Sequence, residues 1–166
     1  MSKRPTWEQY FMGIVDSTAM RATCDRGKSG CIIVSDDNRI LSTGYVGNAS
    51  GAEHCDDIGH TLVHVTEKNI DGELLHEGIH CISTCHAEAN AICSAAKKGV
   101  AIHGATIYCT MTPCFNCMKL IIQSGIKKVF AKYDYHHSDD SKSLAKSLNI
   151  ELVILNDKNC YEPNKV

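Results

Sequence analysis

The sequence predicts an α/β fold with three layers (α/β/α), in which helices cover both faces of a mixed five-stranded sheet. Short hydrophobic runs alternate with amphipathic segments in the second half of the chain, which indicates parallel strands joined by helices. In the first half, two hydrophobic runs flank Asp36-Asp37-Asn38, a pattern typical of a hairpin. The length of 166 residues and the hydrophobic fraction of 43% suit a single domain, 1–166, with a core of its own.

The elements can be assigned in order from periodicity and turn signals. A helix is predicted over residues 7–21, with Thr6 as its N-cap. A strand at 30–34 and its hairpin partner at 39–45 follow. The remaining predicted elements alternate, with helices at 86–98, 114–124 and 138–148 and strands at 106–110, 127–131 and 150–155.

Residues 46–85 differ from the rest of the chain. They are rich in Gly, His, Cys and Asp and show only weak periodicity, so we expect a long irregular loop. An irregular segment of this length inside a compact domain is usually functional.

Composition limits the classes of function. Residues 1–10 are polar and charged, unlike a secretory signal peptide, and no apolar run approaches the ~20 residues of a membrane span. We therefore expect a cytoplasmic protein with no membrane partner, whose ten cysteines are metal ligands, nucleophiles or core residues rather than disulfides. The net charge of −2 supplies no basic field, which argues against a nucleic acid polymer as partner.

Two short motifs carry the chemistry. His86 is followed two residues later by Glu88, and Pro113 precedes Cys114-x-x-Cys117; together they match the pattern of zinc-dependent deaminases of nucleobases. A catalytic zinc takes three protein ligands and keeps one position for water, and His86, Cys114 and Cys117 supply the three. Helix-terminal N–H groups favour the thiolate form of such cysteines. Glu88 is not needed as a ligand and can take the proton of the water.

Other interpretations of these motifs stay open. A lone Cys-x-x-Cys is often a structural zinc site or a redox pair. A structural site would take a fourth protein ligand, such as Cys85 or another histidine, and a redox protein using Cys114 and Cys117 would be active without zinc. The joint pattern, in which both halves lead into helical sequence, is more specific and favours a catalytic zinc.

Further blocks of sequence point to a family. They are Trp7-Glu8-Gln9-Tyr10-Phe11-Met12, Arg21-Ala22-Thr23-Cys24-Asp25-Arg26, Ser42-Thr43-Gly44-Tyr45, His54-Cys55-Asp56-Asp57, His86-Ala87-Glu88-Ala89-Asn90-Ala91-Ile92 and Gln123-Ser124-Gly125-Ile126-Lys127-Lys128-Val129. With the two motifs, they resemble the deoxycytidylate (dCMP) deaminases of the cytidine deaminase superfamily over most of residues 6–154. The resemblance implies a cytidine deaminase-like fold and zinc-dependent hydrolysis of dCMP to dUMP and ammonia, which supplies dUMP for thymidylate synthesis.

The resemblance also implies regulation and assembly. It implies activation by dCTP, inhibition by dTTP, a Mg²⁺ ion with a bound dNTP effector, and a homo-oligomer, often a hexamer. The family usually has Gly-Tyr-Asn-Gly where this chain has Gly44-Tyr45-Val46-Gly47-Asn48. Val46 cannot hydrogen-bond as that Asn would, so either Asn48 substitutes or the loop is rebuilt.

Three residues are candidate contacts to the substrate or to the allosteric nucleotide, namely Gly47, Asn48 and Asn90. The alternative is a plain turn at Gly47 and Asn48 and an ordinary polar helix residue at Asn90. Unranked candidates for the 5′-phosphate are Arg21, Arg26, Lys28 and Lys132.

Some family members close the long loop with a structural zinc. The resemblance implies a second zinc here, with Cys24, Cys55, His80 and Cys81 as its candidate ligands, since four such groups can form a closed tetrahedral site. Single ligands could instead come from His54, His60, His76 or Cys85. Without a metal, the segment would be a loop with free thiols.

Besides dCMP hydrolysis and the redox protein, two classes of function remain. Deaminases of free cytosine, guanine, riboflavin precursors or tRNA adenosine carry similar zinc motifs, and a tRNA enzyme should show a basic stripe, which this chain lacks. A non-catalytic zinc-binding module is the other class, and in such a module Glu88 would have no chemical role.

Overall fold

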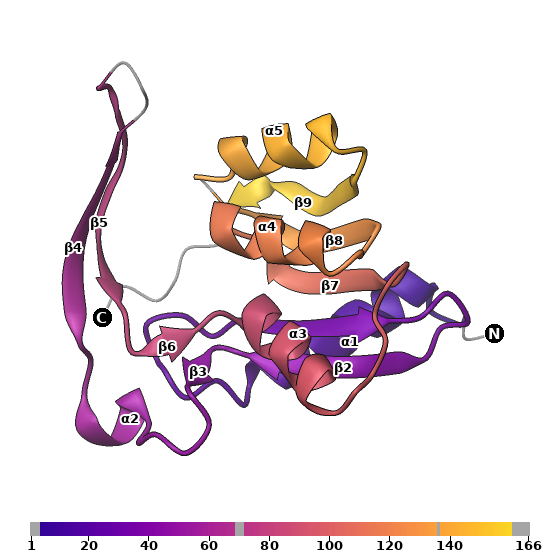
Figure 1. Ribbon diagram of the computed structural model, residues 1–166, viewed down its shortest axis with the longest axis horizontal. Helices are drawn as coiled ribbons and strands as arrows, with labels where there is room; N and C mark the ends of the chain where they lie inside the picture. Colours follow the sequence, from indigo (N-terminus) through magenta and orange to yellow (C-terminus); the bar gives the residue numbers. More distant parts are fainter. Residues whose placement is uncertain (1–3, 69–71, 136, 161–166) are drawn as a thin grey trace.

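A mixed sheet lies at the centre of the protein (Figure 1). The computed structural model describes residues 4–68, 72–135 and 137–160. The strands of the main sheet are β1 (Gly30–Val34), β2 (Ile40–Tyr45), β7 (Thr106–Met111), β8 (Lys128–Asp134) and β9 (Glu151–Cys160). Their order is β2-β1-β7-β8-β9, with β1 antiparallel to both of its neighbours and β7, β8 and β9 parallel. The predicted mixed five-stranded sheet is confirmed.

Helices cover both faces of this sheet. They are α1 (Trp7–Ala19), α3 (Ala87–Lys97), α4 (Phe115–Gln123) and α5 (Asp139–Ser147). Helix α1 packs on one face, against Ile32, Val34, Tyr108 and Phe130, while α3, α4 and α5 pack on the other, against Cys31, Ile33, Ile107, Cys109 and Val129. These sets alternate along the strands because successive side chains point to opposite faces. The three-layer architecture is confirmed.

Helix α1 begins where the sequence predicts. Thr6 Oγ1 accepts a hydrogen bond from Gln9 N at 3.2 Å, and Gln9 Oε1 accepts one from Thr6 N at 3.0 Å, which is a complete capping box. The helix ends at Ala19, two residues before the predicted end. Tyr10 of this helix is 47% exposed, although the apolar spacing of Tyr10, Phe11 and Ile14 in the sequence predicts that they share one face.

The prediction of an irregular loop over residues 46–85 is wrong. This segment contains β3 (Gly47–Asn48), α2 (Cys55–Ile58), β4 (Leu62–Lys68), β5 (Leu74–Cys81) and β6 (Thr84–Cys85). Strands β4 and β5 form an antiparallel hairpin, and β3 pairs with β6. The sequence does not reveal this hairpin because it builds no core of its own: Leu62, Leu74 and Ile79 are exposed, so hydrophobic alternation is weak.

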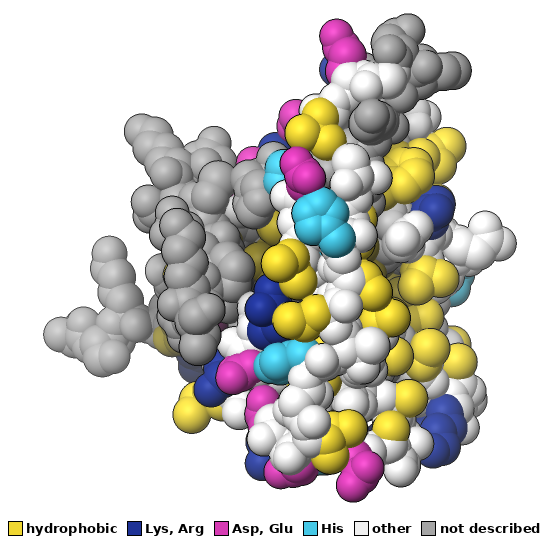
Figure 2. Space-filling view, turned by 90° about the vertical axis from the view of Figure 1, so that its left-hand side faces the viewer, with side chains coloured by type: hydrophobic (Ala, Val, Ile, Leu, Met, Phe, Trp, Pro, Cys, Tyr) yellow, Lys and Arg dark blue, Asp and Glu magenta, His cyan; other side chains and the backbone are white. Residues whose placement is uncertain are grey.

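The hairpin stands apart from the main sheet, at the end to which the carboxyl ends of β7, β8 and β9 point (Figure 1). Figure 2 views the molecule from this side and shows hydrophobic and histidine side chains next to one another on the surface. Within the described ranges, no helix is long and apolar enough to cross a membrane.

Helix α3 lies directly on β2. A Cβ atom at Gly44 would lie 2.2 Å from Ala87 O and 2.4 Å from Ala91 N, so a side chain here would push the helix away. Ser42 Oγ also donates to Ala91 O at 2.7 Å. The start of α3, and with it His86, is therefore held at a fixed, short distance from the sheet.

Candidate active site

The structure brings His86, Cys114 and Cys117 together; we call these residues the first cluster. Their ligand atoms all lie within 4.8 Å of one another. The Sγ atoms of Cys114 and Cys117 lie 3.4 Å and 3.5 Å from His86 Nδ1. Given Zn–S and Zn–N distances of about 2.3 and 2.0 Å, ligand atoms around one tetrahedral zinc lie roughly 3.5 Å apart. The donor set and its spacing therefore fit a zinc ion.

Local structure explains this convergence. His86 is the N-cap of α3 and directly follows β6, while Cys114 is the N-cap of α4 and follows β7 after a short turn. Cys114 O accepts from Met118 N at 2.8 Å, so the helix begins at this residue and places Cys117 in its first turn. Two helix N-termini thus point their positive ends at the cluster, which stabilises thiolates.

The electrostatics of the first cluster favour a cation. A hydrogen bond from the Cys117 thiol lowers the pKa of Cys114 to about 4, assisted by the His86 ring and opposed by burial. The same contact raises the pKa of Cys117. The Cys114 sulfur raises the pKa of His86 to about 9, against the effect of burial. Negative charge on sulfur attracts positive charge here, and a divalent metal can take the place of the protons.

Glu88 lies in the first turn of α3 beside the first cluster and is 6% exposed. Burial raises the pKa of its carboxyl group, while the nearby His86 opposes the rise. The carboxyl group also contacts the Cys117 side chain. A buried carboxyl group with a raised pKa, next to a candidate metal site, is suited to accept and return a proton.

Four more ligands form a second cluster: Cys24, Cys55, His60 and Cys81, whose ligand atoms also lie within 4.8 Å of one another. Cys24 Sγ is 3.6 Å from His60 Nδ1, and the Sγ atoms of Cys55 and Cys81 are 3.6 Å apart. Three of the four predicted ligands therefore lie together.

The fourth member of the second cluster is His60, and His80, predicted as a ligand, is not part of the group. His80 and Cys81 are successive residues of β5, and successive side chains of a strand point to opposite sides. His60 instead reaches the cysteines from the turn before β4. His54 and Cys85 also lie outside the group, and the His76 side chain lies outside the described residues.

A carboxylate supports the second cluster. Asp25 Oδ1 lies 3.0 Å from His60 Nε2, so the ring nitrogen that does not face Cys24 is held by an acid. Partners of this kind orient metal-binding histidines. Asp25 is not among the residues predicted from the sequence for this site, although its position directly after Cys24 is a signal for such a role.

The pKa values of the second cluster are spread widely. Burial raises the pKa of Cys24, and it raises the pKa of Cys55 to about 12. Burial also acts on Cys81, but hydrogen bonds from Ser83, His60 and Cys55 outweigh it and lower the pKa to about 7. One thiol of the group is thus ready to lose its proton at neutral pH, as a metal ligand must.

The residues predicted to contact a nucleotide, Gly47, Asn48 and Asn90, make contacts within the protein. Asn48 Oδ1 accepts from Cys55 Sγ at 3.0 Å, and its Nδ2 donates to Glu53 O at 2.5 Å. Asn90 Nδ2 donates to Tyr45 O at 2.8 Å. A Cβ at Gly47 would lie 2.7 Å from Thr23 Oγ1, so the glycine permits a close approach.

Val46, which stands where the family usually has Asn, packs against the main core. Its backbone accepts from Thr23 N and donates to Ser29 O, both at 3.0 Å. The loop thus has a partly buried hydrophobic residue at this position, and the Asn48 side chain faces Cys55.

Two of the candidate phosphate ligands are engaged elsewhere. Arg26 Nη2 donates to Ile79 O at 2.8 Å, and Lys132 Nζ forms an ion pair with Asp16 of α1 at 2.7 Å. Arg21 and Lys28 are exposed.

Comparisons with known proteins agree with the geometry. Residues 5–133 match the zinc-binding region of cytidine and deoxycytidylate deaminases. The chain is 36% identical over 126 residues to the deoxycytidylate deaminase of Mycobacterium phage D29, which covers 76% of this chain and 94% of that protein. It is 41% identical over 133 residues to ComE operon protein 2 of Bacillus subtilis (strain 168), which covers 80% of this chain but only 62% of that protein.

A solved structure gives the same result. The dCMP deaminase of cyanophage S-TIM5, crystallised in complex with dCMP and dUMP, superimposes with a TM-score of 0.69 at 27% identity, covering 91% of this chain and 98% of that one. The matched region contains the first cluster and Glu88. The chain belongs to the cytidine and deoxycytidylate deaminase family, with the zinc-binding region that defines it.

Proposed function

We propose that this protein hydrolyses dCMP to dUMP and ammonia. The observation that carries the proposal is the pairing of a three-ligand cluster with a buried carboxyl group, Glu88, on the first turn of the helix that follows His86. The similarity to deoxycytidylate deaminases from phages, one of them solved with dCMP and dUMP, supports the substrate.

The chain's own residues suit each proton transfer. Zn²⁺ held by His86, Cys114 and Cys117 would supply a polarised water, with its pKa lowered from 15.7 towards ~7. Glu88 accepts a proton from the attacking water and delivers it to N3 of the cytosine while the C4–O bond forms. Glu88 then moves the second proton of that oxygen to the amino group, so that the C4–N bond breaks, ammonia leaves and a C4 carbonyl remains. Its raised pKa lets it hold the proton within each transfer, between accepting it from oxygen and delivering it to nitrogen.

The second cluster is proposed to bind a structural zinc. Four protein ligands leave no position for water, which is typical of a site that stabilises the fold. The support is the spacing of Cys24, Cys55, His60 and Cys81 and the position of Asp25 behind His60. Such a metal would tie α2 and the end of β5 to the turn after α1.

Regulation and assembly are proposed from the family resemblance. The proposal comprises activation by dCTP, inhibition by dTTP, Mg²⁺ with the bound effector, a homo-hexamer, and a cytoplasmic role in supplying dUMP, without nucleic acid or membrane partners. Val46 is partly buried against the core and its side chain carries no hydrogen-bonding group, so polar effector contacts in this loop have to come from other residues.

The test is ammonia release from dCMP, deoxycytidine and cytidine by the protein and by Glu88→Gln, each with dCTP, with dTTP and with neither. We expect turnover of dCMP alone, lost in Glu88→Gln while the zinc content of the protein stays the same. Turnover that does not respond to dCTP or dTTP would overturn the regulatory part only. Absence of turnover of all three by protein that contains zinc would favour another deaminase substrate or a non-catalytic zinc-binding module.

A further inference from the structure

Asp134, the last residue of β8, binds four hydrogen-bond donors with one carboxylate. Its Oδ1 accepts from Thr112 Oγ1 at 3.0 Å, Tyr135 N at 2.9 Å and Ser138 Oγ at 2.8 Å, and its Oδ2 accepts from Lys142 Nζ at 2.6 Å. The side chain is 18% exposed. A largely buried carboxylate with this many partners holds the segments that supply them in one arrangement.

One of these segments is the turn that carries Cys114. Regular pairing of β7 with β8 ends at Met111 and Tyr133, and Thr112 N then donates to Tyr133 O at 3.0 Å. The next residue, Pro113, has no N–H to donate. The Thr112 hydroxyl, in a residue only 2% exposed, makes the last side-chain hydrogen bonds before Cys114. It lies 3.0 Å from Asp134 Oδ1 and 3.4 Å from Tyr133 O, so the carboxylate is its nearer acceptor.

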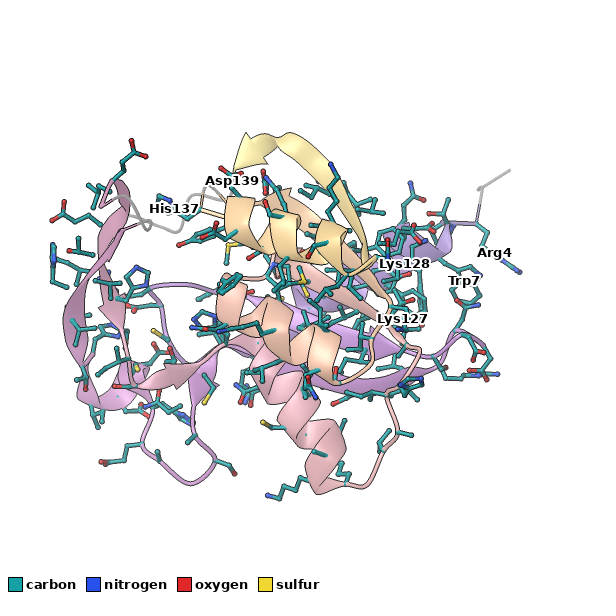
Figure 3. All side chains as sticks on the ribbon, turned by 45° about the horizontal axis from the view of Figure 1, so that its top comes forward. Arg4, Trp7, Lys127, Lys128, His137 and Asp139 are labelled. Carbon is teal, nitrogen blue, oxygen red and sulfur yellow. The ribbon has the colours of Figure 1, made fainter. Side chains whose placement is uncertain are left out.

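The other segment is the start of α5. Ser138 is the N-cap of this helix and is 1% exposed, but its hydroxyl donates to Asp134 instead of capping the helix. Lys142 is one turn further along α5. Figure 3 labels His137 and Asp139 at this end of the sheet and Lys128, the first residue of β8, at the opposite end. Asp134 thus joins the β7–α4 turn to the β8–α5 connection.

We propose that Asp134 is a positioning residue for the deamination, acting through Thr112 to hold the turn that presents Cys114. The inference rests on the proposed function of the first cluster. Small displacements of a metal ligand or of a reacting group lower rates strongly, and supporting hydrogen bonds around metal sites are typically worth about 10- to 100-fold in metal affinity or activity.

Three substitutions test the link. Asp134→Ala removes all four bonds, and we expect kcat/KM for dCMP to fall at least about tenfold and zinc to be lost faster to a chelator. Thr112→Val keeps the shape of the side chain and removes the bond to the turn, so it should produce most of the same loss. Asp134→Asn keeps an acceptor oxygen for Thr112 and should recover most of the activity. The double variant, Asp134→Ala with Thr112→Val, should be hardly less active than Asp134→Ala alone. Both single changes remove the same hydrogen bond, the one between Thr112 and Asp134.

The matched control is Glu151→Gln. Glu151 forms a 2.7 Å ion pair with Lys128 at the opposite end of β8, so its loss should leave kcat/KM and zinc retention unchanged. The proposal is overturned if Asp134→Ala and Thr112→Val lower only the melting temperature, while kcat/KM and zinc retention, measured at temperatures well below melting, stay normal. It is also overturned if the effects of the two substitutions on kcat/KM add in the double variant.

A spectroscopic measurement separates this proposal from the proposed function. In the cobalt-substituted protein, Asp134→Ala should alter the absorption that arises from thiolate bound to Co²⁺, and Glu151→Gln should not. If the unmodified protein released no ammonia from dCMP, the proposed function would fail, and the cobalt spectra would still decide whether Asp134 positions Cys114. Identical spectra for all variants would overturn the inference.

Discussion

The two clusters use the same kinds of ligand but in different surroundings. The first cluster has three ligands, two of them at the starts of helices that pack on the main sheet, and a buried carboxyl group beside them. The second has four ligands: Cys24 after α1, Cys55 in the four-residue helix α2, His60 just before β4 and Cys81 at the end of the hairpin strand β5. Its carboxylate, Asp25, is 56% exposed. Three ligands with a buried acid suit catalysis, and four ligands with an orienting carboxylate suit a structural metal.

The two regions also differ in what else stabilises them. The first cluster is backed by core residues such as Ala87, Met118 and Ile121, which are at most 1% exposed. Around the second cluster, Ile58, Leu62 and Ile79 are at least 48% exposed. A two-stranded hairpin without such backing is only marginally stable in water. We therefore expect metal at the second cluster to matter for folding and metal at the first to matter for chemistry.

The largest expected effect is on turnover. Glu88→Gln should lower kcat for dCMP by about 10²- to 10⁴-fold, because the amide cannot transfer protons. Zinc content and melting temperature should stay close to those of the unmodified protein, since the amide fits the same space. Ammonia release and metal analysis check both. Full activity of this variant would remove the chemical distinction between the clusters.

Next is stability. His60→Ala removes a ligand from the second cluster, and we expect loss of one zinc per chain and a melting temperature lower by about 10 °C or more, a change of a few kcal/mol for a chain of this size. His86→Ala should lower the melting temperature less, although it abolishes turnover. Calorimetry with metal analysis measures this contrast. His80→Ala is the control and should keep the zinc content unchanged; loss of zinc in that variant would restore His80 as a ligand.

A smaller effect, on zinc affinity, is expected from Asp25, which contacts the ligand His60. Asp25→Asn should weaken zinc binding at the second cluster by about 10- to 100-fold while leaving kcat unchanged, because the amide orients His60 less well than a carboxylate. Competition with a chromogenic chelator measures the affinity. A fall in kcat equal to that of Glu88→Gln would show that the two clusters are not separable.

The smallest expected effect is the pH dependence of the stability that Asp134 contributes. Burial alone would raise the pKa of Asp134, but Lys142, Ser138 and Thr112 lower it below its usual value of 3.8. A lowered carboxyl pKa stabilises the folded state above the usual value, and this contribution is lost as pH falls through the lower folded value. The difference in unfolding free energy between the unmodified protein and Asp134→Asn should therefore be constant at neutral pH and shrink below about pH 4. A difference that grows on acidification would contradict the assignment.

The sequence predicted the parts of the molecule that local patterns determine. Hydrophobic periodicity located the strands and helices of the main sheet, and the two short motifs located the first cluster because its ligands sit at helix starts. The second cluster depends on the register of β4 with β5 and on which way Cys81 points, and short motifs carry neither. His60 could therefore not be ranked above His80. The hairpin of β4 and β5 could not be predicted because its exposed hydrophobic side chains, such as Leu62, Leu74 and Ile79, give no clear alternation of buried and exposed positions.

The antiparallel junction between β1 and β7 has a consequence for how the protein folds. Cys31 pairs with Cys109 in this junction, whereas β7, α4, β8, α5 and β9 follow one another closely in the chain. Contacts of long sequence separation form slowly, so the hairpin of β1 and β2 and the carboxyl-terminal unit should each form before they join. His86 is held by α3 on β2, and Cys114 by β7, so the ligands of the first cluster belong to different halves until that late step. The rate at which refolding chains acquire metal at this site should thus report completion of the sheet rather than its nucleation.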